Sequence, residues 1–216
     1  MNDLMKKKIE NGREYRSMMM EAQPDEKMIV EGYATTFDEP YHLYFDDKGR
    51  EVKEMVSRDA FLNTDMSDVI MQYDHEGRVF ARLSNNTLKL STDEHGLKVV
   101  ADLGGTEIGR NLYEEIKGGY TDKMSFGFTV ANDRITKDGD GFLRTILSVG
   151  KLFDVSAVSL PANNLTEISS RSHCDGAIAE IDEEIRRQEE EQRIIAEKKE
   201  HLLARLNALK GEKNGN

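Results

Sequence analysis

The sequence changes its pattern near Pro161, and this change limits the folds that the chain can adopt. Residues 28–160 contain short apolar runs with the two-residue alternation of β-strands, separated by turn residues. Residues 177–210 contain neither Gly nor Pro and repeat apolar residues with helical spacing. For a chain of 216 residues, this pattern predicts one β-rich domain of ordinary size followed by a helical appendage.

Several strands and turns of the β-rich domain can be predicted directly. MIVEGYATTF (28–37) and VIMQY (69–73) have the composition of strands, and TLKLSTDEHGLKVVADL (87–103) predicts a hairpin that turns at DEHG. Residues 126–160 predict two or three further strands, with KDGDG (137–141) as a tight turn. This turn resembles part of a calcium loop, but it lacks the remaining ligands of EF-hand spacing, which favours the turn.

Two short helices are expected within this domain. Residues 57–66 begin at Ser57, a plausible N-cap. Residues 106–120 begin at Thr106, place apolar residues on one face and end at Gly118-Gly119. The full division predicted from the sequence is an N-terminal arm (1–27), a domain (28–168), a linker (169–176), a helix (177–210) and a disordered tail (211–216).

The C-terminal helix carries a heptad seam that is apolar at both ends and polar in the middle. Two interpretations remain open: a solvated helix that folds back on the domain, or a weak coiled coil with itself or a partner. The seam positions are Ile178, Ile181, Ile185, Gln188, Gln192, Ile195, Lys199, Leu202, Leu206 and Leu209.

Charge and composition argue against several classes of protein. The formal net charge of −11 disfavours a nucleic-acid partner, because neutralising phosphates requires clustered Lys and Arg. No apolar run has the length of a membrane span, and the N-terminus lacks the apolar core of a secretory signal. Cys174 is the single cysteine, so no intrachain disulfide can form, and an intracellular protein is expected.

Ser125 stands out in the segment DKMSFGFTV (122–130). Phe126, Phe128 and Val130 alternate like one buried face of a strand, which places Ser125 and Gly127 on the other face. A glycine weakens a strand unless something approaches its backbone closely. Ser125 is therefore either an ordinary strand serine or a nucleophile in a groove that accepts an extended substrate as an added strand.

His75 and Asp154 are the residues that could assist such a serine. His75 follows the strand-like VIMQY directly, although an ordinary loop histidine explains this position as well. Asp154 interrupts the apolar KLFDVSAVSLPA, where a carboxylate needs a partner unless it lies on the solvent side of the strand. An acid that orients an imidazole, which then takes the proton of a serine, is the arrangement used in acyl transfer.

Five segments in order resemble the tailed-phage prohead maturation proteases of the HK97 type, over about residues 28–168. The resemblance places the general base on His75 and the nucleophile on Ser125. The segments are EGYATTFDEP (31–40), EMVSRDAFLNT (54–64), VIMQYDHEG (69–77), GLKVVADLGGTEIGRNLYEEIKGGYTDKMSFGF (96–128) and FDVSAVSLPANNLTEI (153–168).

The fold implied by the resemblance is α+β, a small and mostly antiparallel β-barrel with peripheral helices like that of the herpesvirus assembly proteases. In those enzymes the third member of the triad is a histidine, but no histidine follows Ser125 within the domain, so Asp154 is expected in that role. By analogy of position, an oxyanion donor is expected among the backbone N–H groups near Ala162–Asn164.

The implied activity is a serine endopeptidase that acts in the host cytoplasm inside the immature capsid, without metal or organic cofactor. Its expected partners are the major capsid protein with its scaffolding segment, and a second copy of the chain through the C-terminal helix; no nucleic acid or membrane partner is expected. The alternatives are a non-enzymatic scaffold protein, a protease fused to a scaffold, and a generic β-rich binding module.

Overall fold

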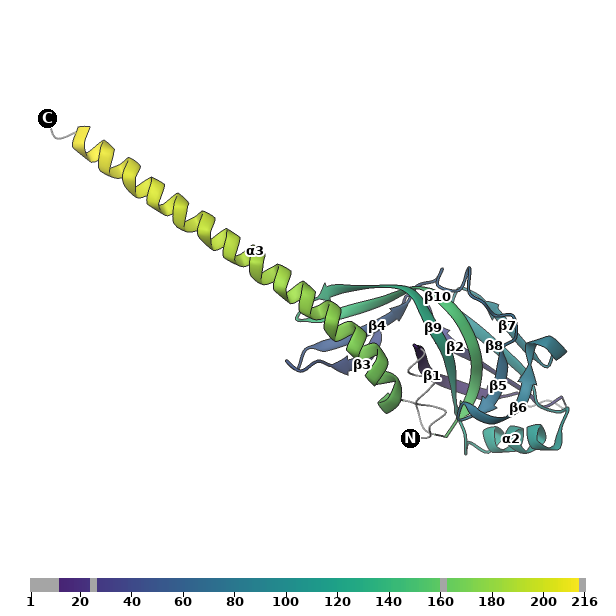
Figure 1. The fold of residues 1–216 in the computed structure, drawn as a ribbon. Helices are drawn as coiled ribbons and strands as arrows, with labels where there is room; N and C mark the ends of the chain where they lie inside the picture. The colour runs from purple at the N-terminus through teal and green to yellow at the C-terminus, as the bar shows by residue number, and fades with distance from the viewer. Residues whose placement is uncertain (1–11, 24–26, 160–162, 214–216) are drawn as a thin grey trace. The chain divides into compact units, whose positions relative to one another are not determined.

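The computed structural model describes residues 12–23, 27–159 and 163–213, and it divides the chain into two compact units, Met1–Cys174 and Asp175–Asn216. The first unit is dominated by a ten-stranded sheet (Figure 1). The elements are β1 (Arg13–Ala22), β2 (Ile29–Thr36), β3 (Tyr41–Phe45), β4 (Glu51–Val56), β5 (Ile70–Tyr73), β6 (Glu76–Arg82), a 3-10 turn (Leu83–Asn85), β7 (Leu88–Thr92), β8 (Gly96–Asp102), α2 (Glu107–Lys117), β9 (Lys123–Asp138), β10 (Gly141–Val158) and α3 (Asn163–Lys213).

The strands follow the order β3-β4-β10-β9-β1-β2-β8-β7, with β5 and β6 branching from β10. Most pairings are antiparallel, but β10 pairs in parallel with β4 along its first half and with β5 along its second half. This open path confirms the α+β class and a mostly antiparallel sheet, but the closed barrel that the resemblance implied is not found.

The two longest strands, β9 and β10, form a hairpin that lies side by side along nearly its whole length (Figure 1). Its turn falls in KDGDG, as predicted, with Gly139 in the left-handed region at φ 58°. The half of β9 nearest α2 pairs with β1 on its other edge. This half of the hairpin carries Ser125 and Asp154.

The core is apolar, and α2 packs one face against it. Thr106 caps α2 by accepting a hydrogen bond from the Gly109 N–H at 3.1 Å, and Gly118 is the C-cap, as the sequence predicted. Leu112 and Ile116 are buried on the inner face of the helix. The core also draws on the inner faces of several strands, with Val30, Met71, Leu97, Val99, Phe126, Phe128, Leu152 and Val155 among its members.

Three local predictions differ from the structure. Residues 13–22, which the sequence analysis assigned to the N-terminal arm, form β1 within the sheet. Residues 57–66, expected to be a helix, form successive turns in which Ala60 N–H bonds Ser57 O and Leu62 N–H bonds Asp59 O. The expected linker, 169–176, is helical within α3, which continues to Lys213; residues 214–216 of the expected tail lie outside the described residues.

Helix α3 is a single helix of 51 residues (Figure 1). Within the described ranges, no helix combines the length and the hydropathy that a membrane span requires.

A buried network of charged groups links β1, β4 and β10. Arg144 donates to both Glu14 carboxylate oxygens, at 2.7 and 2.8 Å, and to Glu54 Oε2 at 2.9 Å. Arg16 donates to the two Glu54 oxygens at 2.5 and 2.6 Å, and Tyr41 also donates to Glu54. Burial alone would raise the pKa of Glu14, but the charges and hydrogen bonds of Arg16 and Arg144 hold it below its ordinary value.

Replacing Glu54 by alanine tests this network. The change leaves the buried Arg16 and Arg144 guanidinium groups short of negative charge, so the free energy of unfolding should fall by about 3–5 kcal/mol. Denaturant titration measures the loss. Glu51→Ala is the matched control, because Glu51 lies on the same strand but is exposed and should cost less than about 1 kcal/mol. Equal losses for the two variants would show that the network adds nothing to the fold.

Candidate functional site

Ser125 lies in the centre of the sheet, in a row of three serines on adjacent strands. It pairs with Ser17 on β1 and with Ser156 on β10. The neighbouring row on the same face consists of Tyr15, Gly127 and Asp154. The alternation of β9 therefore places Ser125 and Gly127 together, on the face opposite Phe126 and Phe128, as the sequence predicted.

A register shift in β10 places Asp154 on this face. Leu152 pairs with Phe128, but Asp154 already pairs with Gly127, so Phe153 is an extra residue on its strand. Without the bulge, residues 152 and 154 would share one face and Asp154 would lie in the apolar core. Because of the bulge, Asp154 joins the Ser125 face, while Val155 continues the core face that Leu152 occupies.

His75 lies in the two-residue turn that joins β5 to β6. Asp74 and His75 both have positive φ angles, 47° and 60°, as a type I′ turn between paired Tyr73 and Glu76 requires. The turn is fastened to the end of β10: Asp74 N–H donates to Ala157 O at 2.9 Å, and Ser159 N–H donates to Asp74 Oδ1 at 3.0 Å. The hairpin thus holds the imidazole over the face that carries Ser125.

The structure brings the three predicted residues into one hydrogen-bonded series. His75 Nδ1 lies 2.5 Å from Asp154 Oδ1, and His75 Nε2 lies 2.8 Å from Ser125 Oγ. Since a carboxylate only accepts, Nδ1–H donates to Asp154, which leaves the Nε2 lone pair free to accept from the serine hydroxyl. The arrangement can move a proton from Ser125 Oγ to an imidazole that a carboxylate orients.

Asp154 is surrounded by groups that favour its charged form. Burial alone would raise its pKa, but the His75 hydrogen bond and charge, the Ser156 hydroxyl and the Arg13 guanidinium lower it below the ordinary value. Ser156 Oγ donates to Asp154 Oδ1 at 2.8 Å, and an Arg13 nitrogen lies 3.7 Å from Oδ2. The site therefore holds a buried carboxylate that stays ionised.

Tyr15 is a component of the site that the sequence did not predict. Its ring lies edge-on to the His75 ring, with the ring centroids 4.2 Å apart. Burial and the negative charge of Asp154 raise the pKa of Tyr15 to about 12. The signal was hidden because Tyr15 lies among Arg13, Glu14 and Arg16, whose charges resemble a solvated arm.

Gly127 makes room for these groups. A Cβ at this position would lie 2.6 Å from Asp154 Oδ2 and 2.8 Å from Tyr15 Cε1, closer than Cβ atoms approach other atoms. The close approach inferred from the sequence is real, but it is made by side chains of the same chain.

The expectation that substrate adds as a strand beside Ser125 is wrong for this structure. The segment of β9 around Ser125 pairs with β1 on one edge and with β10 on the other, so neither edge is open. Ser125 is also fully buried, at 0% exposure, as are His75 at 2% and Asp154 at 1%. Access to the hydroxyl therefore requires part of the structure to move.

Two further points concern the predicted site. Of the residues expected to supply an oxyanion donor, Ala162 lies outside the described residues, and Asn163 and Asn164 are the first residues of α3. Among the described residues, no group of three or more His, Cys, Asp or Glu side chains is arranged to hold a metal ion.

Replacing Gly127 by alanine tests the packing of the site. The added methyl group must displace Asp154 or Tyr15, so the free energy of unfolding should fall by about 1–3 kcal/mol. Denaturant titration measures the loss. Gly150→Ala on β10 is the control, because its Cβ would lie no closer than 3.3 Å to its neighbours and should cost clearly less. A Gly127 variant as stable as the Gly150 variant would contradict the tight packing.

The lowered pKa of Asp154 predicts a specific dependence of stability on pH. A carboxylate with a lowered folded-state pKa stabilises the fold above its unfolded-state pKa, near 3.8, and this contribution is lost as pH falls through the folded value. The difference in unfolding free energy between the parent and Asp154→Asn should therefore shrink as pH falls from 6 to 3. Asn132→Ala, at an exposed position of β9, removes no titratable group and should show a constant difference. A constant difference for both variants would exclude the proposed linkage.

The similarity of this chain to known proteins is consistent with a serine that lies beside a histidine and an aspartate. Residues 14–177 match the family described as caudovirus prohead serine protease. No curated protein and no solved structure gives a significant match. The matched segment begins within β1 and includes every strand that surrounds Ser125. Because the match extends over most of the sequence, the chain belongs to the caudovirus prohead serine protease family.

Proposed function

We propose that Ser125, His75 and Asp154 form the catalytic triad of this serine peptidase. The observation that carries the proposal is the hydrogen-bonded series from Ser125 Oγ through the His75 ring to Asp154, with distances of 2.8 and 2.5 Å. Membership of a serine protease family requires a nucleophilic serine. Ser125 meets this requirement, because its Oγ lies within hydrogen-bond reach of a histidine nitrogen.

The proposed triad gives each group a role. Ser125 Oγ attacks the carbonyl carbon of the peptide bond while His75 Nε2 takes the hydroxyl proton. Asp154 stabilises the imidazolium that forms and does not itself take the proton. The tetrahedral intermediate collapses as Nε2–H protonates the leaving amine, which gives an acyl-enzyme. Water then attacks the ester with the same histidine as base, which releases the acid and restores Ser125.

The proposed third member is an aspartate, where the herpesvirus assembly proteases have a histidine. Two observations support Asp154 in this role. Its pKa is lowered, so it is ionised when an imidazolium forms beside it. Its Oδ1 also accepts from Ser156, which limits the carboxylate to one orientation toward His75 Nδ1.

We also propose that the substrates are the capsid protein, through its scaffolding segment or a separate scaffold, and the chain itself. The family acts in the phage prohead, where these proteins are the concentrated neighbours. Because Ser125 is fully buried, the enzyme in this state is latent and must open before it cleaves. A latent state would protect the capsid protein before the shell has assembled.

Substitution of Ser125 by alanine tests the proposal. The full chain and the variant are each incubated with the capsid protein, and intact masses are followed over hours. The parent chain should yield fragments with defined ends, whereas the variant should be slower by about 10⁶-fold, which is below detection. Ser91→Ala on β7, an exposed serine far from the triad in sequence, should cleave like the parent.

The outcomes separate the alternatives. If parent and Ser125→Ala chains both stay intact beside the capsid protein, the chain is not a peptidase under these conditions, and the scaffold interpretation replaces the proposal. If both are trimmed at the same sites, a contaminating protease is responsible and Ser125 is not the nucleophile.

A further inference from the structure

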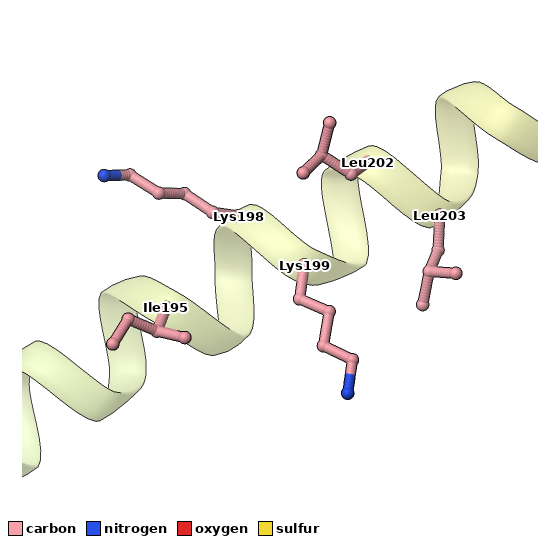
Figure 2. Close-up of a pocket in the computed structure, with 5 residues that line it drawn as sticks. All are labelled: Ile195, Lys198, Lys199, Leu202 and Leu203. Carbon is pink, nitrogen blue, oxygen red and sulfur yellow. The ribbon is translucent and has the colours of Figure 1, made fainter.

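Helix α3 carries an exposed apolar face in its C-terminal part. Ile195, Leu202 and Leu203 are 51–59% exposed, which is unusual for large apolar side chains spaced along one helix. Figure 2 shows the side chains of these three residues and of Lys198 and Lys199 along the helix. Two of them, Ile195 and Leu202, are positions of the heptad seam.

The charges that flank this seam change sign along the helix. Glu184 and Glu191 immediately precede the seam residues Ile185 and Gln192, whereas Lys198 and Arg205 occupy the equivalent places one and two heptads further on. Such flanking positions face a partner helix and determine its identity and orientation. Among the described residues, Lys198 and Arg205 form no ion pair.

A parallel pair of these helices places like charges together. In a parallel coiled coil, a residue that flanks the seam in this way faces the residue five positions further along the partner chain. Glu184 would then face Glu189 of the second copy, which is repulsive. Glu191 and Lys198 would face Ala196 and Leu203 of the second copy and gain no ion pair.

An antiparallel pair brings opposite charges together. If Glu191 faces Lys198 of the second copy, the same register places Glu184 opposite Arg205 of the second copy. The two-fold symmetry repeats both contacts, so four ion pairs form. In this register Ile185 faces Leu202, so apolar residues meet near the ends of the segment, and Gln188 faces Lys199, so polar residues meet further in. At the centre, Gln192 faces Ile195.

We propose that the segment from Glu184 to Arg205 associates with the same segment of a second copy as an antiparallel coiled coil. The occupant of the exposed face is a second copy because the charge reversal lies within one helix, which makes the segment complementary to itself when reversed. The polar layers make the association weak and dependent on concentration. The two Glu184 residues lie at opposite ends, about 30 Å apart, so the preceding domains attach at opposite ends of the pair.

Cysteine cross-linking tests the orientation in the full chain carrying Ser125→Ala, so that any self-cleavage cannot remove the helix. In the proposed register, residue 185 lies opposite residue 202 of the second copy, so a mixture of the Ile185→Cys and Leu202→Cys chains should form a disulfide-linked heterodimer. Residue 188 lies about 16 Å from its own counterpart, beyond disulfide reach, and Gln188→Cys should not cross-link. The parent, in which Cys174 is buried, gives the background.

Charge variants test the specificity by sedimentation equilibrium. Glu184→Lys/Glu191→Lys should weaken the dimer at least about tenfold, because four attractive contacts become repulsive. Lys198→Glu/Arg205→Glu should do the same, and mixing the two variants should restore a heterodimer. Glu183→Lys/Glu190→Lys is the matched control: it makes the same change of charge one residue away, on the face opposite the seam, and should leave the dimer unchanged.

Several results would overturn the proposal. A chain that stays monomeric at high concentration has no such interface. Cross-linking of Gln188→Cys to itself without cross-linking between Ile185→Cys and Leu202→Cys, or a stronger dimer for Glu184→Lys/Glu191→Lys, would indicate a parallel pair. Equal weakening by Glu183→Lys/Glu190→Lys would reduce the effect to net charge. None of these readouts depends on peptidase activity, so the proposal can fail while the proposed triad stands.

Discussion

The antiparallel pairing of β9 with β10 is the constraint on which the rest of the structure depends. It extends from Lys123–Val158 at one end to Asp138–Gly141 at the turn, and β1, β4 and β5 all add to it. The bulge at Phe153 changes which face the following residues occupy. A regular ladder would reverse the faces of the residues that follow: it would move Val155 out of the core and would place Asp154 in the core, away from His75.

Strand β1 separates two buried polar systems. On one face, Glu14 and Arg16 join the ion network with Glu54 and Arg144. On the other face, Tyr15 packs against His75, which bonds Asp154. In such surroundings a hydrogen bond is strong and an unpaired charge is costly, so removing a charged partner from either system should destabilise the fold. This connects the stability of the sheet to the geometry of the candidate site.

The burial of Ser125 affects how the family activity operates in this chain. In the proposed triad, the hydroxyl, the imidazole and the carboxylate are already within hydrogen-bond distance, so opening would have to admit the peptide bond but would not have to assemble the series. Preformed geometry of this kind lowers the reorganisation that accompanies reaction. Control of cleavage would then lie in access to the site, which suits a protease that is enclosed with its substrate.

Local patterns in the sequence determined much of this protein. Alternating apolar residues predicted β2, β7, β8 and the β9–β10 hairpin, and capping residues predicted α2. Motif chemistry and the family resemblance identified His75, Ser125 and Asp154, which the structure brings together. The strands, the turn and the helix depend on neighbours in the chain, and the three site residues were recognised from short motifs, which is why the sequence alone reveals them.

Only the tertiary structure decided the rest, because the contacts are made by residues far apart in the chain. Strand β1 was missed since its charged residues are paired with Glu54 and Arg144, which reverses the usual pattern of polar residues outside. The face of Asp154 depends on a bulge that alternation cannot predict. The closed edges beside Ser125 depend on which strands pair, and pairing is a property of the folded sheet.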